Sequence, residues 1–216
     1  MSKIILYGIE ASPPVRAILL TLKALNLDYE FREVDLFKGG HLTEEFLKKN
    51  PQHTVPVLED DGQFLWDSHS IAAYLVRKYG KNDDLYPKDF HKRAIVDQRL
   101  HFDSGVFFPS LRNITFPIWT GICKNVPQEK IDAVHQAFDF LETFLEHDYL
   151  AGDSLTIADF SAVSTATSFD LLAPIDSAKY PKVVAWINRI SKLPYYEEAN
   201  AKGVVLLNGN LKKLLL

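Results

Sequence analysis

The feature that most constrains the fold is a short stretch in which an apolar run, a serine and two prolines meet a helical pattern. The run Ile4–Tyr7 is compact and apolar, as expected of a buried strand. Pro13 and Pro14 suit a first helical turn, which has no use for their missing amide hydrogens. Apolar residues then recur at helical spacing and form one face: Val15, Ile18, Leu19, Leu22 and Leu25. The stretch therefore predicts a strand leading into a helix, with Ser12 at the switch.

A serine at such a switch can act in two ways. Its side chain can cap the helix, or it can present its hydroxyl to a ligand at the positive end of the helix dipole. On this stretch alone the plain cap is the favoured interpretation for Ser12. The rest of the chain reverses that preference.

The first part of the chain predicts an α/β unit of seven elements. After the first strand and helix come a half-buried strand near Tyr29–Arg32, a short helix that Thr43 caps, two strands around the Asp61-Gly62 turn, and a helix from Ser68 to Gly80. A helical crossover makes the first two strands parallel, and the hairpin makes an antiparallel pair. The order predicts a thioredoxin-like βαβαββα domain over residues 1–80.

The remainder predicts helices only. The polar stretch 81–88 ends in a proline and is interpreted as a linker, and residues 89–216 as an all-helical domain. One long helix is expected over residues 89–113 with a bend near Gly105 or Pro109, and others over 128–147 and 181–192. Thr156 and Asp159 form a capping box at the start of another helix. The apolar tail from Val204 is expected to fold over another part of the molecule.

Charge and cysteine content exclude several classes of function. A net charge of −4 gives no electrostatic basis for binding nucleic acid, and no run of residues is long and apolar enough for a membrane span. The single cysteine, Cys123, excludes an internal disulfide and favours a reducing compartment. The first residues lack the apolar region of a secretory leader. These features predict a cytoplasmic protein without nucleic-acid or membrane partners.

Four motifs follow one another along the chain: Ala11-Ser12-Pro13-Pro14, Asn50-Pro51-Gln52-His53-Thr54-Val55-Pro56, Asp67-Ser68-His69-Ser70-Ile71 and Leu155-Thr156-Ile157-Ala158-Asp159-Phe160. In this order they resemble the motifs of cytosolic glutathione transferases, and within that family those of the insect epsilon class. The resemblance covers the whole chain. It implies a thioredoxin-like first domain, an all-helical second domain and a homodimer. It also implies glutathione as co-substrate, with no metal and no covalently bound cofactor.

The resemblance implies a glutathione site in the first domain, and the residue types suit it. Val55, extended by the following proline, can offer its backbone edge to a peptide, and in the family the bond to Pro56 is cis. Asp67 suits the ammonium of the γ-glutamyl end, while Ser68 and its helix N-terminus suit the carboxylate. Ser68 is also expected to cap its helix. The residues expected to bind glutathione are His41, His53, Thr54, Val55, Pro56, Asp67, Ser68, His69 and Arg112.

Some of these residues have a plainer interpretation. His41 and His53 lie in loops, where histidines are usually solvated, although here they can donate to the glycyl carboxylate. His69 lies one residue into its helix, and family members place it near a two-fold axis, so it can instead face its mate in a second subunit. The Thr156–Asp159 box is structural, and Cys123 is interpreted as an incidental thiol.

An electrophile pocket is expected between the two domains. The residues expected to line it are Phe108, Leu111, Arg112, Phe116, Trp119 and Leu207. The alternative for the aromatic residues is a buried core. An arginine among aromatic residues needs a polar partner, so Arg112 is expected to face the cleft near glutathione or a polar group of the co-substrate. Leu206 and Leu207 are expected to close the pocket from the other side.

The resulting expectation is a serine-type glutathione transferase that joins the glutathione thiolate to hydrophobic electrophiles, with Ser12 as the hydrogen-bond donor to sulfur. The resemblance implies detoxification of xenobiotics, including insecticides, and of lipid-peroxidation products, with peroxidase and dehydrochlorinase activities as further options. Three alternatives differ from it. Maleylacetoacetate isomerases carry a run of serines and a cysteine, from which Ser12-Pro13-Pro14 departs. A cysteine-dependent thiol transferase is disfavoured because position 12 is serine. A non-enzymatic binding protein of the same fold remains open.

Overall fold

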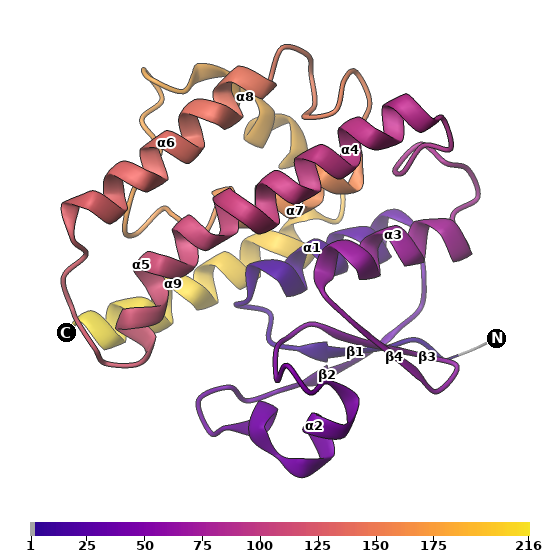
Figure 1. The fold of residues 1–216 in the computed structure, drawn as a ribbon, viewed down its shortest axis with the longest axis horizontal. Helices are drawn as coiled ribbons and strands as arrows, with labels where there is room; N and C mark the ends of the chain where they lie inside the picture. Colours follow the sequence, from indigo (N-terminus) through magenta and orange to yellow (C-terminus); the bar gives the residue numbers. More distant parts are fainter. Residues whose placement is uncertain (1–2) are drawn as a thin grey trace.

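A computed structural model describes residues 3–216, which form an α/β part followed by a helical part (Figure 1). Met1 and Ser2, with which the predicted first domain begins, lie outside the described residues. The α/β part comprises β1 Ile5–Gly8, α1 Pro13–Ala24, β2 Glu30–Glu33, α2 Glu44–Lys49, β3 Val57–Asp60, β4 Gln63–Trp66 and α3 Ser68–Tyr79. The helical part comprises α4 Phe90–Phe102, α5 Phe108–Trp119, α6 Gln128–Phe144, α7 Ile157–Ala166, α8 Pro181–Ile190 and α9 Lys202–Leu215. The predicted element order of a thioredoxin-like domain is confirmed.

The sheet has the strand order β2-β1-β3-β4. β1 and β2 are parallel, whereas β1–β3 and β3–β4 are antiparallel, as the crossover and the hairpin predict. The hairpin turns at Asp61 and Gly62, whose φ angles of 51° and 74° are both positive. Such a turn matches the twist of the flanking strands and favours glycine at its second position.

Both faces of the sheet are covered, because α2 lies on one side and α1 and α3 lie on the other (Figure 1). Side chains of a strand alternate between faces. Ile5 and Tyr7 therefore pack with Phe46 of α2, while Leu6 and Leu58, paired in register, pack with α1 and α3. This double covering explains why all four residues of β1 are buried and why its sequence is a continuous apolar run.

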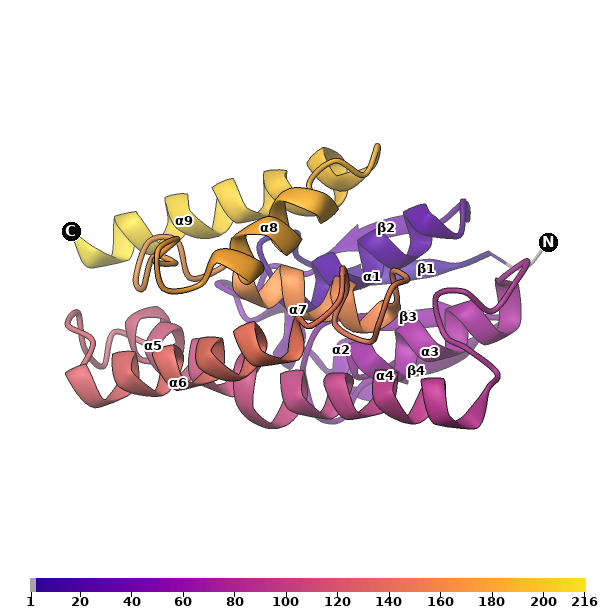
Figure 2. The same cartoon turned by 90° about the horizontal axis from the view of Figure 1, so that it is seen from above.

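Helix α1 is buried on both sides. Its predicted apolar face packs on α3 and the sheet, and its opposite side packs against α7, which lies in the middle of the helical part (Figure 2). Every residue from Val15 to Leu22 is therefore buried, and these include the polar residues Arg16 and Thr21. The spacing of apolar residues predicts one buried face only. The second is created by the helical part, which brings polar groups on α7 to Arg16.

The long helix expected over residues 89–113 consists of α4 and α5 joined by a π-helical turn, Asp103–Phe107. The turn contains Gly105, so the α-helical geometry is interrupted at one of the two positions where a bend was predicted. It also turns Asp103 and Phe107 inward, where both are buried. The predicted end near residue 113 is wrong, because Ile114 and Ile118 continue the buried face of α5 and favour two further turns.

Two further features of the helical part are the start of α7 and the apolar tail. The predicted capping box is confirmed at the start of α7, where Asp159 Oδ2 accepts from the Thr156 amide at 2.8 Å. Asp159 Oδ1 also accepts from the Leu150 amide and from Trp186 Nε1, both at 2.9 Å, and burial raises the pKa of this carboxyl. The apolar tail is helix α9, which follows a π-helical turn over Glu197–Ala201.

No helix within residues 3–216 has the length and apolar character needed to cross a bilayer.

Candidate active site

Ser12 occupies the N-cap position of α1, directly after the tight turn that follows β1. Its backbone is extended, with φ −76° and ψ 122°, and its carbonyl accepts from the Arg16 amide at 3.0 Å. The side chain makes no capping bond, and no other partner for the hydroxyl occurs among residues 3–216. The plain-cap interpretation is therefore wrong, because the α1 amide that a cap would satisfy is not bonded by this hydroxyl. The half-buried hydroxyl lines a cavity instead.

The cavity beside Ser12 measures about 460 Å³ and lies between the two parts of the molecule. From the helical part it is lined by all six residues that the sequence proposes for an electrophile pocket: Phe108, Leu111, Arg112, Phe116, Trp119 and Leu207. Ile9, Leu36 and Phe37 line it from the α/β part and were missed, since only folding brings their loops to α5. The Phe37 ring lies 5.0 Å from the Trp119 ring, centroid to centroid, and joins the two walls.

One prediction about this cavity is wrong, and another is tested only in part. Leu206 is not among the lining residues and is 48% exposed, because only Leu207 lies on the inward face of α9. Arg112 faces the cavity, as predicted. Its guanidinium lies over the Phe116 ring, 4.4 Å from the centroid, and its side chain has no polar partner in the part of the chain that the structure describes. The expected contact of Arg112 with glutathione or with a polar group of the co-substrate stays a prediction.

A second cavity, of about 240 Å³, lies on the other side of the α1 N-terminus. It contains six of the residues that the sequence assigns to glutathione: Thr54, Val55, Pro56, Asp67, Ser68 and His69. The Val55–Pro56 peptide bond is cis, as the resemblance implies. Phe108 lines both cavities, Pro13 lines the first and Pro14 the second. The N-terminus of α1 therefore borders both cavities, and Ser12 itself lines the apolar one.

Helix α3 begins at the polar cavity, and its cap differs from the prediction. Asp67 is the N-cap residue, and its Oδ1 accepts from the Ser70 amide at 3.0 Å. The expected cap by Ser68 is wrong, because the helix begins at Ser68 itself and aspartate, one residue earlier, is an equally good cap. Ser68 is buried against the cavity, 6% exposed, so its hydroxyl is left to other partners.

His69 connects three elements in a row of polar groups. Its Nε2 lies 2.9 Å from Oδ2 of Asp103, whose Oδ1 accepts from Thr165 Oγ1 at 2.9 Å. Its Nδ1 lies 3.7 Å from Asp67 Oδ1. Burial disfavours the imidazolium, but the two carboxylates outweigh it and raise the pKa of His69 to about 9. His69 is therefore a cation bonded within its own chain, and its place at a two-fold axis stays a prediction.

The charge on His69 also affects the ionisation of Asp67. The His69 imidazolium and the Ser70 amide together lower the pKa of Asp67 to about 2, although burial opposes them. The carboxylate is 54% exposed, so a ligand can reach it. An ionised carboxylate beside free helix N-terminal amides suits a group that carries an ammonium and a carboxylate, such as an amino-acid end.

His41 and His53 lie next to each other, and only His41 lines a cavity. Their ring centroids lie 6.2 Å apart, and His41 lines the apolar cavity from a 3₁₀ turn, Gly40–Leu42. Burial and the neighbouring His53 lower the pKa of His41. His41 Nδ1 is buried without a partner among the described residues, whereas His53 is exposed, with φ 47°.

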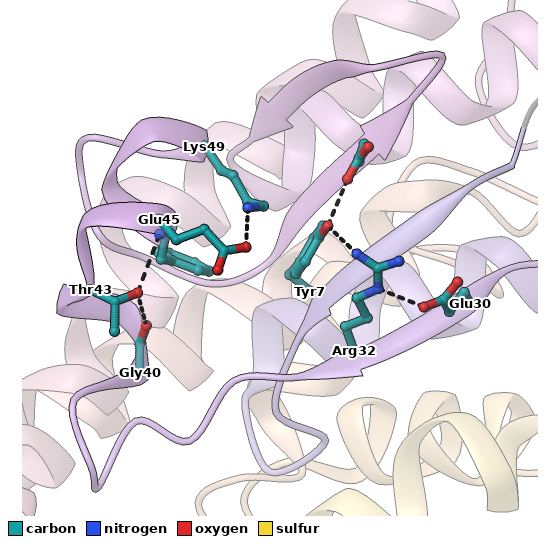
Figure 3. Close-up of polar contacts among 9 residues, drawn as sticks. Tyr7, Glu30, Arg32, Gly40, Thr43, Glu45 and Lys49 are labelled. Carbon is teal, nitrogen blue, oxygen red and sulfur yellow. Dashed lines mark hydrogen bonds and ion pairs between the residues drawn. The ribbon is translucent and has the colours of Figure 1, made fainter.

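Thr43 holds the turn that carries His41. Its Oγ1 accepts from the Phe46 amide at 3.3 Å, capping α2, and donates to the Gly40 carbonyl at 3.1 Å (Figure 3). The cap was predicted from the sequence. The second bond was missed, since it depends on the path of the preceding loop.

Tyr7 is a second hydroxyl close in sequence to Ser12, but it is already bonded. Its hydroxyl donates to Glu59 Oε2 at 2.6 Å and accepts from Arg32 Nη1 at 2.9 Å (Figure 3). The ring packs on the α2 side of the sheet with Phe46, and neither cavity is lined by it. Burial and the Glu59 carboxylate raise the pKa of Tyr7 to about 12.

The single cysteine of the chain lies outside both cavities. Cys123 is free, lies between α5 and α6, and lines neither cavity. Within residues 3–216, no group of three or more His, Cys, Asp and Glu side chains is arranged to hold a metal ion.

Comparison with known families matches both parts of the chain. The model of the glutathione S-transferase N-terminal domain matches residues 6–83, and that of the glutathione S-transferase C-terminal domain matches residues 107–194. The chain is 50% identical over 201 residues to Glutathione S-transferase 1 of Manduca sexta, and the match covers 92% of each chain.

Solved structures give the same relationship. An epsilon-class glutathione S-transferase from the housefly Musca domestica superposes with a TM-score of 0.96 at 56% identity, over 98% of both chains. A glutathione transferase homolog from Drosophila mojavensis, determined with bound glutathione, superposes with a TM-score of 0.93 at 51% identity, over 99% of this chain and 98% of that one.

Proposed function

Because this chain belongs to the glutathione S-transferase family, we propose that it joins the thiol of glutathione to apolar electrophiles at the site beside Ser12. Insect members of the family are among its similar proteins, and detoxification is the role that fits this class. The single observation that carries the assignment of the site is the Ser12 hydroxyl. It makes no capping bond and has no partner among residues 3–216, and it lines the apolar cavity at the α1 N-terminus, whose next residues, Pro13 and Pro14, line the apolar and the polar cavity respectively.

In the proposed mechanism, Ser12 stabilises the thiolate of glutathione. The thiol loses its proton to solvent, and the Ser12 hydroxyl then donates a hydrogen bond to the sulfur anion. The N-terminal end of α1 favours the same anion. The thiolate forms the new S–C bond with the electrophile, and the leaving group departs with the electron pair of the bond that breaks. With halogenated substrates the thiolate can instead remove a proton and cause elimination.

The polar cavity is the proposed place for the γ-glutamyl end of glutathione. Its ammonium would pair with Asp67, and its carboxylate would accept from Ser68 and the amides of α3. The backbone edge of Val55 would pair with the peptide as an added strand does. The remaining binding residues are His41 and His53 at the glycyl carboxylate, with Thr54, Pro56 and His69 shaping the cavity.

The apolar cavity is the proposed place for the electrophile. Phenyl, indole and leucine side chains from α5 and α9 provide a third of its lining residues, and Ile9, Leu36 and Phe37 add further apolar surface, so an apolar compound gains free energy by leaving water. Arg112 is the proposed polar contact, because a guanidinium over Phe116 can stabilise negative charge on a carbonyl or nitro group. Compounds that fit this description include insecticides and lipid-peroxidation products. Peroxidase and dehydrochlorinase activities would use the same thiolate.

We also propose the division of the chain among these tasks. Residues 1–80 would bind glutathione, residues 81–88 would link the domains, and residues 89–216 would carry most of the electrophile site. Two copies would form a homodimer through α3 and α4, where Asp67, His69, Tyr86 and Leu100 line a groove on the surface.

The test is a spectrophotometric assay of conjugation between glutathione and 1-chloro-2,4-dinitrobenzene. The proposal expects turnover that saturates with both substrates. The absence of any rate at saturating glutathione, with glutathione binding retained in calorimetry, would instead identify a non-enzymatic binding protein.

A further inference from the structure

Helix α9 makes an unusually close backbone contact with the loop that precedes Ser12. A Cβ atom added to Gly203 would lie 2.2 Å from the Glu10 carbonyl oxygen and 2.5 Å from Cδ of Arg16. The first neighbour is backbone and cannot rotate away. No residue larger than glycine fits at position 203 unless the helix or the loop shifts.

A second glycine in the same helix provides a contrast. A Cβ atom added to Gly209 would meet nothing within 4 Å. Glycine in a helix interior lowers the stability of the helix by about 1 kcal/mol relative to alanine, and nothing in this structure requires glycine at position 209. At position 203, by contrast, the close approach to the Glu10 backbone requires glycine.

A buried polar network fixes the start of α9 at the same place. Arg16 Nη1 donates to Asn200 Oδ1 at 2.8 Å, and Asn200 Nδ2 donates to Thr167 Oγ1 at 3.2 Å. Arg16 Nη2 donates to the Ser164 carbonyl at 3.0 Å and to the Ser168 hydroxyl. Arg16 and Asn200 are both 0% exposed. Breaking such a bond inside the molecule leaves a buried charge without its partner, which resists any movement of Asn200 relative to α1.

Arg16 also belongs to the helix that Ser12 begins. Its amide donates to the Ser12 carbonyl, so the network that holds Asn200 starts one turn from the proposed catalytic hydroxyl. Among residues 3–216 no carboxylate lies within ion-pair distance of Arg16. Neutral groups from α7, from the two residues that follow it and from the turn before α9 therefore provide its hydrogen bonds.

The face of α9 that carries Gly203 also carries the pocket wall. Gly203 and Leu207 are four residues apart and so lie on the same side of the helix. Leu207 packs with Ala11 and lines the apolar cavity together with Ser12. Figure 1 shows α9 running from the neighbourhood of α1 along α5 to the C-terminus.

We propose that Gly203, with the Arg16–Asn200 pair, is a specificity-determining contact that fixes how closely Leu207 approaches Ser12. The contact holds α9 against the Glu10 backbone and thereby sets the width of the electrophile pocket. It is a positioning contact, since neither Gly203 nor Asn200 lines the cavity. This inference rests on the proposed function.

The proposal predicts how Gly203→Ala alters substrate choice. The added methyl group forces α9 away from the Glu10 carbonyl, carries Leu207 outward and widens the pocket. The ratio of kcat/KM for a bulky apolar electrophile to that for 1-chloro-2,4-dinitrobenzene should then rise about tenfold, since one misplaced apolar contact changes discrimination by this order. The KM for glutathione should stay within about twofold, because the polar cavity does not involve α9.

Gly209→Ala is the matched control, because it makes the same chemical change in the same helix where space is open. Its substrate ratio should equal that of the wild type. A Gly203→Ala protein that folds, conjugates and keeps the wild-type ratio would overturn the inference while leaving the proposed function intact. A wild-type protein without conjugation would instead contradict the proposed function.

Leu207→Phe tests the same contact if Gly203→Ala does not fold. A helix held at Gly203 cannot retreat to make room for the larger ring. The kcat/KM for the bulky electrophile should therefore fall about tenfold while that for the small one changes less. Equal kcat/KM for the bulky compound in Leu207→Phe and the wild type would show that α9 moves freely and would refute the inference.

Discussion

Ser12 is a hydroxyl that remains free at a helix N-terminus because the fold gives it no capping partner. A free thiol of the cysteine type has a pKa of about 8.5, so little thiolate is present near neutral pH. In Ser12→Ala, turnover at pH 6.5 should fall about thirtyfold, which corresponds to the loss of about 2 kcal/mol from one hydrogen bond to an anion. Glutathione affinity should change much less, because Val55 and the α3 N-terminus stay in place.

The measurement is the pH profile of turnover at saturating glutathione for both proteins. Raising the pH should recover part of the rate lost in Ser12→Ala, since hydroxide then supplies the thiolate. If both profiles have the same apparent pKa, Ser12 does not tune the thiol.

His69 makes the stability of the fold depend on pH. Its pKa is raised to about 9, whereas an unfolded histidine has a pKa of about 6.5. The stabilisation is therefore complete below about pH 6.5 and is lost as the pH rises through about 9, with a total of at most about 3 kcal/mol. Asp67 acts in the opposite sense, and its contribution is lost only as the pH falls toward 2.

Urea unfolding at pH 6 and pH 9 tests this prediction, with His69→Gln as the control. The difference in unfolding free energy between the wild type and the variant should be large at pH 6 and small at pH 9. A difference that does not vary with pH would mean that the bond to Asp103 does not hold a charged imidazole.

Among the elements, the short helix α2 matters because its cap also positions a site residue. Thr43→Ala removes the bond to the Phe46 amide and the bond to the Gly40 carbonyl together. The cost in stability should be about 1 kcal/mol, as for other N-cap residues. Since the Gly40–Leu42 turn carries His41, the KM for glutathione should rise several-fold with kcat nearly unchanged.

Thr43→Ser is the matched control, because it keeps the hydroxyl and both bonds. Steady-state kinetics with glutathione as the varied substrate separates the two outcomes. A fall in kcat with no change in KM would indicate that the turn bears on the thiolate rather than on peptide binding.

The π-helical turn between α4 and α5 orients residues that line or contact the site. It points Asp103 toward His69 and Thr165, and it starts α5 at Phe108, which lines both cavities. An unbroken α-helix would turn these side chains to other directions, since each residue rotates the helix by about 100°.

At the scale of the whole molecule, we predict a homodimer that forms through α3 and α4. Ala73 of α3 lies in the groove formed with α4 and contributes no group to either cavity of the site. Sedimentation at micromolar concentration should give twice the mass of one chain without any ligand. Ala73→Glu should reduce that mass to one chain, because two copies of the carboxylate would be buried close to the symmetry axis.

Ala73→Ser is the neutral control for this experiment and should remain a dimer. A wild-type protein that sediments as one chain would contradict the dimer and with it the proposed place of His69 at a two-fold axis.

Local patterns in the sequence by themselves determined much of this protein. Three elements depend only on residues close together in the chain, so they could be predicted. They are the strand at Ile4–Tyr7, the hairpin at Asp61-Gly62 and the helix start at Thr156–Asp159. The motif around Val55–Pro56 placed the polar cavity, and the aromatic residues from Phe108 to Trp119 placed the apolar one.

Only the tertiary structure decided the partners that lie far apart in the chain. His69 finds Asp103 at a separation of 34 residues, and Arg16 finds Asn200 at a separation of 184. Likewise Leu207 lines the cavity whereas Leu206 faces outward, and Gly203 touches the Glu10 backbone. Periodicity shows which face of a helix is apolar, but the register between two packed helices depends on side chains from both. For that reason many residues that line the two cavities could be predicted, while the contacts that hold them in position could not.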